Sequence, residues 1–280
     1  MIVQKDIVIP DFTGNKRATV YREEGIPLRA TILYLHGGAL IYGSRKDLPE
    51  THINAICSAG YGIVAVDYPL CPEAKLPEIL NDVIDTVTWY LREREGIFGC
   101  KLGYFLFGRS AGAYLCLLTM RQKLIEKPRG IISYYGYGLL HDKWYNSPSA
   151  FYCRYPAMPA SCLRKPGGSV HYELALPLGY GTYVCLRQRG EWGTFLGGND
   201  DTLYTLRGFD PAGAPPLFIA HSTGDPDVPF DEYLSLKELF PDAVHYTTFL
   251  PKHDFDADSN APSTIEVLDV TVSFLDANTQ

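Results

Sequence analysis

The stretch of the chain with the clearest chemical potential is Gly108-Arg109-Ser110-Ala111-Gly112, which places a serine between small residues. An apolar run typical of a buried strand precedes it, and a helical pattern follows it. This strand–turn–helix setting is what a nucleophile elbow requires, because the sharp turn lifts the serine hydroxyl off the sheet. The helix N-terminus also brings partial positive charge beside the serine. We therefore predict that Ser110 is a nucleophile, although the pattern alone fits a glycine-rich turn equally well.

A second motif, His36-Gly37-Gly38-Ala39, follows an apolar run at residues 31–35. Glycines let the backbone approach a substrate carbonyl and point N–H groups at its oxygen. We expect Gly37 and Gly38 to form an oxyanion hole, with the N–H of Ala111 as a third donor. The histidine of the motif is expected to hold the loop rather than to react.

An acid and a base follow the serine in the chain order Ser, Asp, His. Asp225 lies beyond an expected strand at residues 217–221, and His253 lies beyond an expected strand at residues 244–249. In this arrangement His253 takes the proton of the serine, and Asp225 orients the imidazole. Asp227 lies two residues after Asp225 and remains an alternative acid.

The elements that must position these residues alternate between strands and helices. Apolar runs predict strands at residues 6–9, 18–22, 31–35, 61–66, 102–107, 130–135, 217–221 and 244–249. Helical spacing is found at residues 80–91 and 111–122, and a capping box at residues 263–266 predicts the start of the last helix. This alternation predicts an α/β fold with a mostly parallel central sheet flanked by helices. Ligands of such sheets bind at the edge where the strands end.

Residues 139–215 interrupt this alternation and are rich in aromatic side chains. We expect a cap inserted before the acid-bearing strand, with residues 1–138 and 216–280 forming the core. The alternative is a set of extra helices packed on the flank of the sheet. Candidate substrate contacts are His141 and Trp144 in this segment, and Tyr42 and Arg109 beside the two glycine motifs.

The bulk composition sets limits on partners and compartment. The chain has 280 residues, a formal net charge of -7 and 46% hydrophobic residues, which suits one globular core and gives no support for a nucleic-acid partner. No apolar run is long enough to span a bilayer, and the first residues lack the pattern of a secretory signal. None of the seven cysteines forms a C-x-x-C pair, so we expect reduced thiols and a cytoplasmic protein rather than disulfides or a zinc site.

Taken together, these motifs resemble α/β-hydrolases of the hormone-sensitive-lipase-like carboxylesterase group, and small uncharacterised bacterial hydrolases of that fold. The stretch from His36 to Ser44 resembles the oxyanion loop of the group. The stretch from Asp67 to Glu73, with Pro77 and Asp82, resembles its second signature. The resemblance covers most of the chain outside residues 139–215.

The acid loop resembles a different group as well. Residues 221–229 are similar to the acid loop of prolyl-oligopeptidase-type hydrolases, which favours Asp225 over Asp227. Two positions depart from the carboxylesterase pattern: Pro69 stands where the group usually has Arg, and Arg109 stands where an acidic or neutral residue usually precedes the serine. An ion pair usual in the group is therefore expected to be missing.

The resemblance implies a serine hydrolase that cleaves small apolar carboxylic esters through an acyl-enzyme intermediate. No metal or organic cofactor is implied, and the expected partner is a small-molecule ester. Amidase, formamidase or peptidase activity on the same three residues is one alternative. A catalytically silent binding protein is another.

Overall fold

Eight strands form a single sheet in the order β1-β2-β4-β3-β5-β6-β7-β8. The computed structural model describes residues 1–11, 13–197 and 204–279, and at positions 141 and 142 the backbone alone. β1 pairs antiparallel with β2, and β2 with β4, whereas all pairs from β4 through β8 are parallel. The strands are β1 (Ile2–Val8), β2 (Arg17–Glu23), β3 (Ala30–Leu35), β4 (Tyr61–Val66), β5 (Tyr104–Arg109), β6 (Ile131–Tyr134), β7 (Leu217–Ser222) and β8 (Val244–Thr248).

The five inner parallel strands are buried along their whole length. Every residue of β3, β4, β5, β6 and β7 is buried, whereas the edge strands β1 and β8 are partly exposed. This burial explains why their sequences are continuous apolar runs, because helices cover both faces of a parallel sheet.

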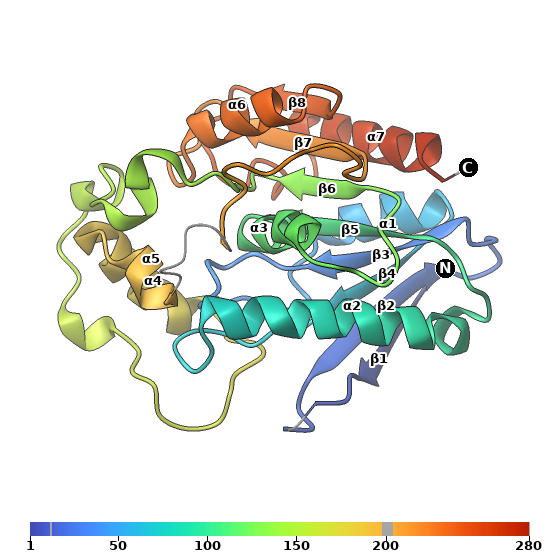
Figure 1. The fold of residues 1–280 in the computed structure, drawn as a ribbon, viewed down its shortest axis with the longest axis horizontal. Helices are drawn as coiled ribbons and strands as arrows, with labels where there is room; N and C mark the ends of the chain where they lie inside the picture. The colour runs from blue at the N-terminus through green and yellow to red at the C-terminus, as the bar shows by residue number, and fades with distance from the viewer. Residues whose placement is uncertain (12, 198–203, 280) are drawn as a thin grey trace.

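Helices cover the two faces in two groups (Figure 1). α1 (Glu50–Ser58) and α7 (Pro262–Ala277) pack together on one face. α2 (Leu76–Phe98), α3 (Ala111–Leu118) and α6 (Phe230–Leu239) bury their apolar side chains on the other. The sheet is therefore the middle layer of three, and the functional loops leave it at its strand ends.

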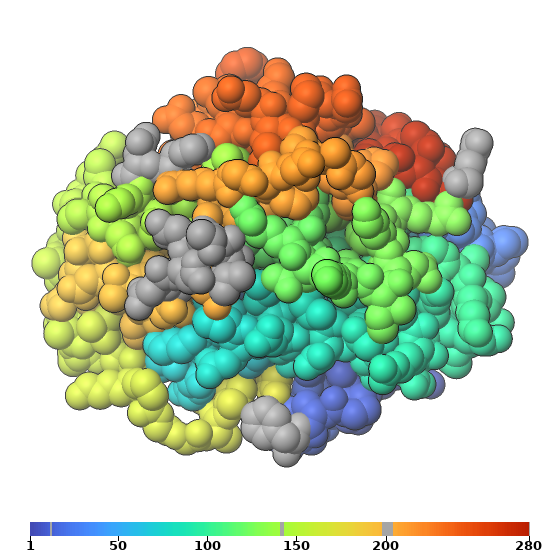
Figure 2. Space-filling model, viewed as in Figure 1, coloured from blue at the N-terminus to red at the C-terminus, as the bar shows by residue number. Residues whose placement is uncertain are grey.

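The segment between β6 and β7 lies at the end of the sheet where the parallel strands finish (Figure 1). Its elements are α4 (Leu176–Arg189), α5 (Trp192–Leu196) and the 3-10 turns η2 (His141–Asn146), η3 (Tyr152–Arg154) and η4 (Ala160–Cys162). In the space-filling view these residues cover that end of the molecule beside the start of α2 (Figure 2). A β-bridge between Gly43 and Leu174 joins the segment to the core.

The predicted α/β class and mostly parallel sheet are confirmed, and the differences are local. β5 extends to Arg109, directly against Ser110, because Arg109 still pairs with Tyr134 of β6. The helix predicted over 111–122 ends at Leu118 and continues as a 3-10 turn, η1 (Thr119–Arg121).

The predicted capping box at residues 263–266 is wrong. α7 begins one residue earlier, at Pro262, and has no side-chain cap. The Ser263 hydroxyl instead donates to the Phe255 carbonyl oxygen at 3.2 Å. A proline in the first turn needs no N–H partner, so it can start the helix without a capping serine.

No described helix is long and apolar enough to cross a membrane.

Candidate active site

Ser110 stands at the turn between β5 and α3, with a φ of 53°. The turn brings three backbones close together. A Cβ on Gly108 would collide with the backbone at Gly112 and Ala113, and a Cβ on Gly112 would collide with the carbonyl oxygens of Leu35 and His36. Small residues are therefore required on both sides of the serine, which is the physical reason for the motif.

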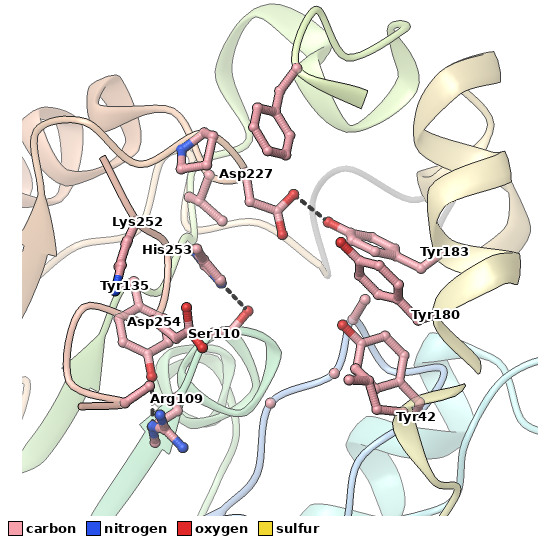
Figure 3. A pocket seen from close by; sticks show the side chains of 18 of the residues that line it. Tyr42, Arg109, Ser110, Tyr135, Tyr180, Tyr183, Asp227, Lys252, His253 and Asp254 are labelled. Atoms are coloured by element: carbon pink, nitrogen blue, oxygen red, sulfur yellow. Dashed lines mark hydrogen bonds between the residues drawn. The ribbon is translucent and has the colours of Figure 1, made fainter. Parts of the chain in front are cut away.

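The structure brings Ser110, His253 and Asp225 together as a chain of hydrogen bonds. His253 Nε2 lies 2.8 Å from Ser110 Oγ (Figure 3), and His253 Nδ1 lies 2.7 Å from Asp225 Oδ2. The other carboxylate oxygen of Asp225 accepts the N–H groups of Asp227 at 2.8 Å and Val228 at 3.0 Å. When the Nδ1 proton is donated to Asp225, Nε2 can accept the proton of the Ser110 hydroxyl.

The charged forms of His253 and Asp225 stabilise each other. Burial acts to lower the pKa of His253, but Asp225 in contact and Asp227 and Asp254 nearby raise the pKa to about 9. Burial acts to raise the pKa of Asp225, but the charge of His253 and the hydrogen bonds of both His253 and His221 hold that pKa well below its usual range. Asp225 is thus a carboxylate, and His253 binds a proton more tightly than a free imidazole does.

Asp227 has a different set of partners from Asp225. Its Oδ1 accepts hydrogen bonds from Tyr183 Oη at 2.7 Å and Arg187 Nη1 at 2.6 Å, both in α4. The side chain of Arg187 is 3% exposed and stabilises this contact by stacking on aromatic rings of the 139–215 segment. Asp227 therefore connects the 139–215 segment to the loop that carries Asp225.

The glycine motif after β3 forms a tight loop beside the serine. Gly38, Ala39 and Leu40 all adopt positive φ angles, of 99°, 57° and 62°. A Cβ on Gly38 would collide with the Tyr42 carbonyl oxygen, whereas a Cβ on Gly37 would lie 3.4 Å from Ser110 Cβ. The predicted donors Gly37 and Ala111 thus flank the serine, and their oxyanion role remains a prediction.

Tyr68 is a supporting residue that the sequence motifs did not mark as functional. Its hydroxyl donates to the carbonyl oxygens of His36 at 2.8 Å and Gly37 at 3.2 Å. Its ring stacks on the His36 ring at 4.1 Å. In the sequence, the indication of its importance was its position within the stretch from Asp67 to Glu73, which resembles the second signature of the carboxylesterase group. The buried His36 therefore helps to hold the loop, as its sequence position suggested.

Ser110 and His253 open into a cavity of about 680 Å³. Tyr42, one of the predicted substrate contacts, lines it opposite the serine, with Tyr180 and Tyr183 of α4 (Figure 3). Asp47, Asp227, Lys252 and Asp254 also line the cavity and add polar residues to this aromatic wall. The cavity is consequently mixed in polarity rather than purely apolar.

The other three predicted substrate contacts are placed differently. Arg109 borders the cavity, but its guanidinium points away from the Ser110 hydroxyl, toward the protein interior (Figure 3). Trp144 is not among the residues that line the cavity; its indole donates to Glu232 Oε1 at 3.0 Å. His141 begins η2, and its side chain lies outside the described part of the structure.

Within residues 1–11, 13–197 and 204–279, no group of three or more His, Cys, Asp or Glu side chains is arranged to hold a metal ion.

Known proteins resemble this chain both in sequence and in structure. A family model described as alpha/beta hydrolase fold matches residues 32–161. An α/β-hydrolase superfamily protein from Enterococcus faecalis is 26% identical with a TM-score of 0.81, and covers 98% of this chain and 99% of its own. The chain has the α/β-hydrolase fold. The predicted resemblance is thereby confirmed, and the family match supports a hydrolase.

Other solved structures share this hydrolase fold. A protein of unknown function from Staphylococcus aureus subsp. aureus Mu50 is 27% identical with a TM-score of 0.81, covering 99% of this chain and 100% of its own. Carboxyl esterase 2 from Tuber melanosporum is 21% identical with a TM-score of 0.68, covering 99% of this chain and 88% of its own.

A curated relative matches only part of this chain. The non-reducing polyketide synthase adrD of Penicillium rubens is 31% identical over 142 residues, which is 47% of this chain and 6% of the synthase. The chain therefore corresponds to a small part of that much longer protein.

The raised pKa of His253 predicts an alkaline activity profile. Only the neutral imidazole can accept the serine proton. With a pKa of about 9 for His253, any hydrolytic activity of this site should therefore gain kcat/KM as pH rises from 6 to 9. Asp254→Asn should move the midpoint to lower pH, whereas Asn at the exposed Asp269 of α7 should leave it unchanged. A midpoint at the ordinary histidine pKa near 6.5 would contradict this assignment.

Substitutions of the two aspartates should separate their roles. Asp225→Asn should lower kcat by about 10³- to 10⁴-fold, because the amide favours the wrong histidine tautomer. Asp227→Asn should lower the melting temperature, because the buried Arg187 would lose its carboxylate partner, but should keep kcat within about tenfold. Steady-state kinetics and thermal unfolding of both variants measure these effects, and the reverse order in kcat would identify Asp227 as the acid.

Proposed function

We propose that this chain is a serine hydrolase that cleaves carboxylic esters through an acyl-enzyme intermediate. The observation that carries the proposal is the hydrogen-bonded chain Ser110–His253–Asp225 at the wall of the large cavity. A nucleophile, a base and an acid in contact at these distances fit acyl transfer. A solved structure that shares this fold is a carboxyl esterase, so the fold is compatible with ester hydrolysis.

The proposed reaction uses each group of the site in turn. His253 takes the Ser110 proton as Oγ bonds to the ester carbonyl carbon, and Asp225 stabilises the imidazolium that forms. The N–H groups of Gly37, Gly38 and Ala111 donate to the oxyanion, and loss of one such donor costs about 3–4 kcal/mol. The ester C–O bond then breaks as His253 returns the proton to the leaving alcohol. Water, deprotonated by the same histidine, releases the carboxylic acid and restores the serine.

We infer that residues 139–215 act as the cap of this site. α4 supplies Tyr180 and Tyr183 to the cavity, and Trp192 of α5 donates to the Ala39 carbonyl oxygen at 3.1 Å. A cavity of about 680 Å³ lies within the range typical of small-molecule sites. Its aromatic walls favour esters with apolar or aromatic groups.

We also propose a cytoplasmic location. The support is that all seven cysteines, Cys57, Cys71, Cys100, Cys116, Cys153, Cys162 and Cys185, are free thiols.

Removal of the nucleophile tests the proposed function. Ser110→Ala should lower the turnover of short p-nitrophenyl esters by about 10⁴-fold or more, because no other group can form the acyl-enzyme. Ser58→Ala, which alters an exposed serine of α1, serves as the matched control and should keep full activity. Unchanged turnover in Ser110→Ala would refute the proposed mechanism.

The choice of ester over amide is tested with paired substrates. Matched p-nitrophenyl esters and p-nitroanilides with the same acyl group should differ in kcat/KM, with the ester preferred. Equal rates on the two substrates would favour the amidase alternative.

A further inference from the structure

A buried cluster of charged side chains lies beneath Ser110 and His253 and takes no part in the proposed proton transfers. At its centre is Asp256, which is 0% exposed and lies three residues after His253. Its Oδ1 accepts hydrogen bonds from Arg109 Nη2 at 3.1 Å and from Tyr135 Oη at 2.8 Å. Its Oδ2 lies 2.8 Å from His52 Nε2 of α1. Partners from three separate segments of the chain thus hold one carboxylate.

Arg109 connects this carboxylate to the nucleophile. It is the last residue of β5, directly before Ser110, and it is 8% exposed. Its guanidinium also donates from Nε to Tyr135 Oη at 2.5 Å and from Nη1 to the Asp47 carbonyl oxygen at 3.2 Å. A cation this deeply buried needs a carboxylate partner, and Asp256 supplies it.

The same carboxylate anchors the loop that carries the histidine. His253 lies between β8 and α7, where Pro251, Lys252 and Asp254 are exposed but Phe255 and Asp256 are buried. The loop is therefore fixed on the C-terminal side of His253 by these two buried residues.

Tyr135 contacts both His253 and the Arg109–Asp256 pair. Its ring centroid lies 4.7 Å from that of His253, and its hydroxyl contacts Asp256 and Arg109. Its backbone has a φ of 40°, a strained conformation for a tyrosine that its many contacts must hold in place.

We propose that Arg109 and Asp256 are positioning residues that couple the serine turn to the histidine loop and so fix the Ser110–His253 contact. This inference rests on the proposed function of the site. It also explains why an arginine precedes the serine: the partner of that arginine is an aspartate on the histidine loop.

The role follows from geometry rather than from charge at the histidine. The carboxylates that chiefly raise the pKa of His253 are Asp225, Asp227 and Asp254. The charge of Asp256 is matched by Arg109 in direct contact. Removing the pair should therefore lower kcat while the KM and the pH midpoint of activity stay near their original values.

The experiment compares Asp256→Asn with the double variant Arg109→Gln/Asp256→Asn. The single variant leaves a buried cation without its carboxylate, so its melting temperature should fall. The double variant removes both charges and should recover much of that stability. Its kcat on a p-nitrophenyl ester should remain about tenfold to a hundredfold low, because a small misplacement of reacting groups is costly, with KM changed by less than about threefold.

Two further variants complete the design. Asp82→Asn removes the carboxylate that pairs with the buried Lys16, away from the cavity, and should lower stability without lowering kcat. Arg109→Lys keeps a cation beside Asp256, so it tests the coupling even if the double variant fails to fold; one ammonium cannot replace the three guanidinium contacts, and kcat should again fall at least about tenfold.

The outcomes separate this inference from the proposed function. Wild-type kcat in a folded double variant, or in Arg109→Lys, would overturn the positioning role while leaving the serine mechanism intact. Retained turnover in Ser110→Ala would instead remove the proposed function itself.

Discussion

The contact between His253 Nε2 and Ser110 Oγ, at 2.8 Å, joins two residues 143 positions apart in the chain. The two residues lie in different kinds of local structure. Ser110 is held by a turn so tight that its neighbours must be small, whereas His253 sits in an exposed loop after the edge strand β8. In the proposed mechanism, proton transfer from Ser110 requires this distance to stay short. We therefore interpret the buried Arg109–Asp256 pair beneath the site as support for this contact.

Several contacts connect the 139–215 segment to the loops of the site. Arg187 pairs with Asp227, two residues beyond the proposed acid Asp225. Trp192 donates to the carbonyl oxygen of Ala39, and Leu174 bridges to Gly43, both in the loop after β3. The segment that shapes the cavity thus also contacts the acid loop and the proposed oxyanion loop. A substitution in this segment can therefore change both substrate fit and catalytic geometry.

Sequence patterns predicted the structural features that depend on residues close together in the chain. The tight turn at Ser110, the strand at residues 61–66 and the order of strands and helices follow from residue size and apolar periodicity, and the structure contains them. The start of α7 differed because a first-turn proline replaced the expected serine cap. These features depend on residues only a few positions apart.

Contacts between residues far apart in the chain could not be predicted from such patterns. The sequence left Asp225 and Asp227 as alternatives, because both lie on one loop and only the folded chain shows which reaches His253. Arg109 and Trp144 were predicted to contact substrate, but their partners Asp256 and Glu232 lie 147 and 88 positions away. The side-chain direction of a residue beside an active site depends on such distant partners, which spacing in the sequence does not encode.

A crystal structure of the protein after reaction with diethyl p-nitrophenyl phosphate would test the proposed serine mechanism at the level of atoms. The mechanism predicts phosphorus bonded to Ser110 Oγ, with the phosphoryl oxygen accepting hydrogen bonds from the N–H groups of Gly37, Gly38 and Ala111. It also predicts that His253 remains hydrogen-bonded to Asp225. An unmodified Ser110 after complete reaction, or an adduct whose phosphoryl oxygen faces away from those N–H groups, would contradict it.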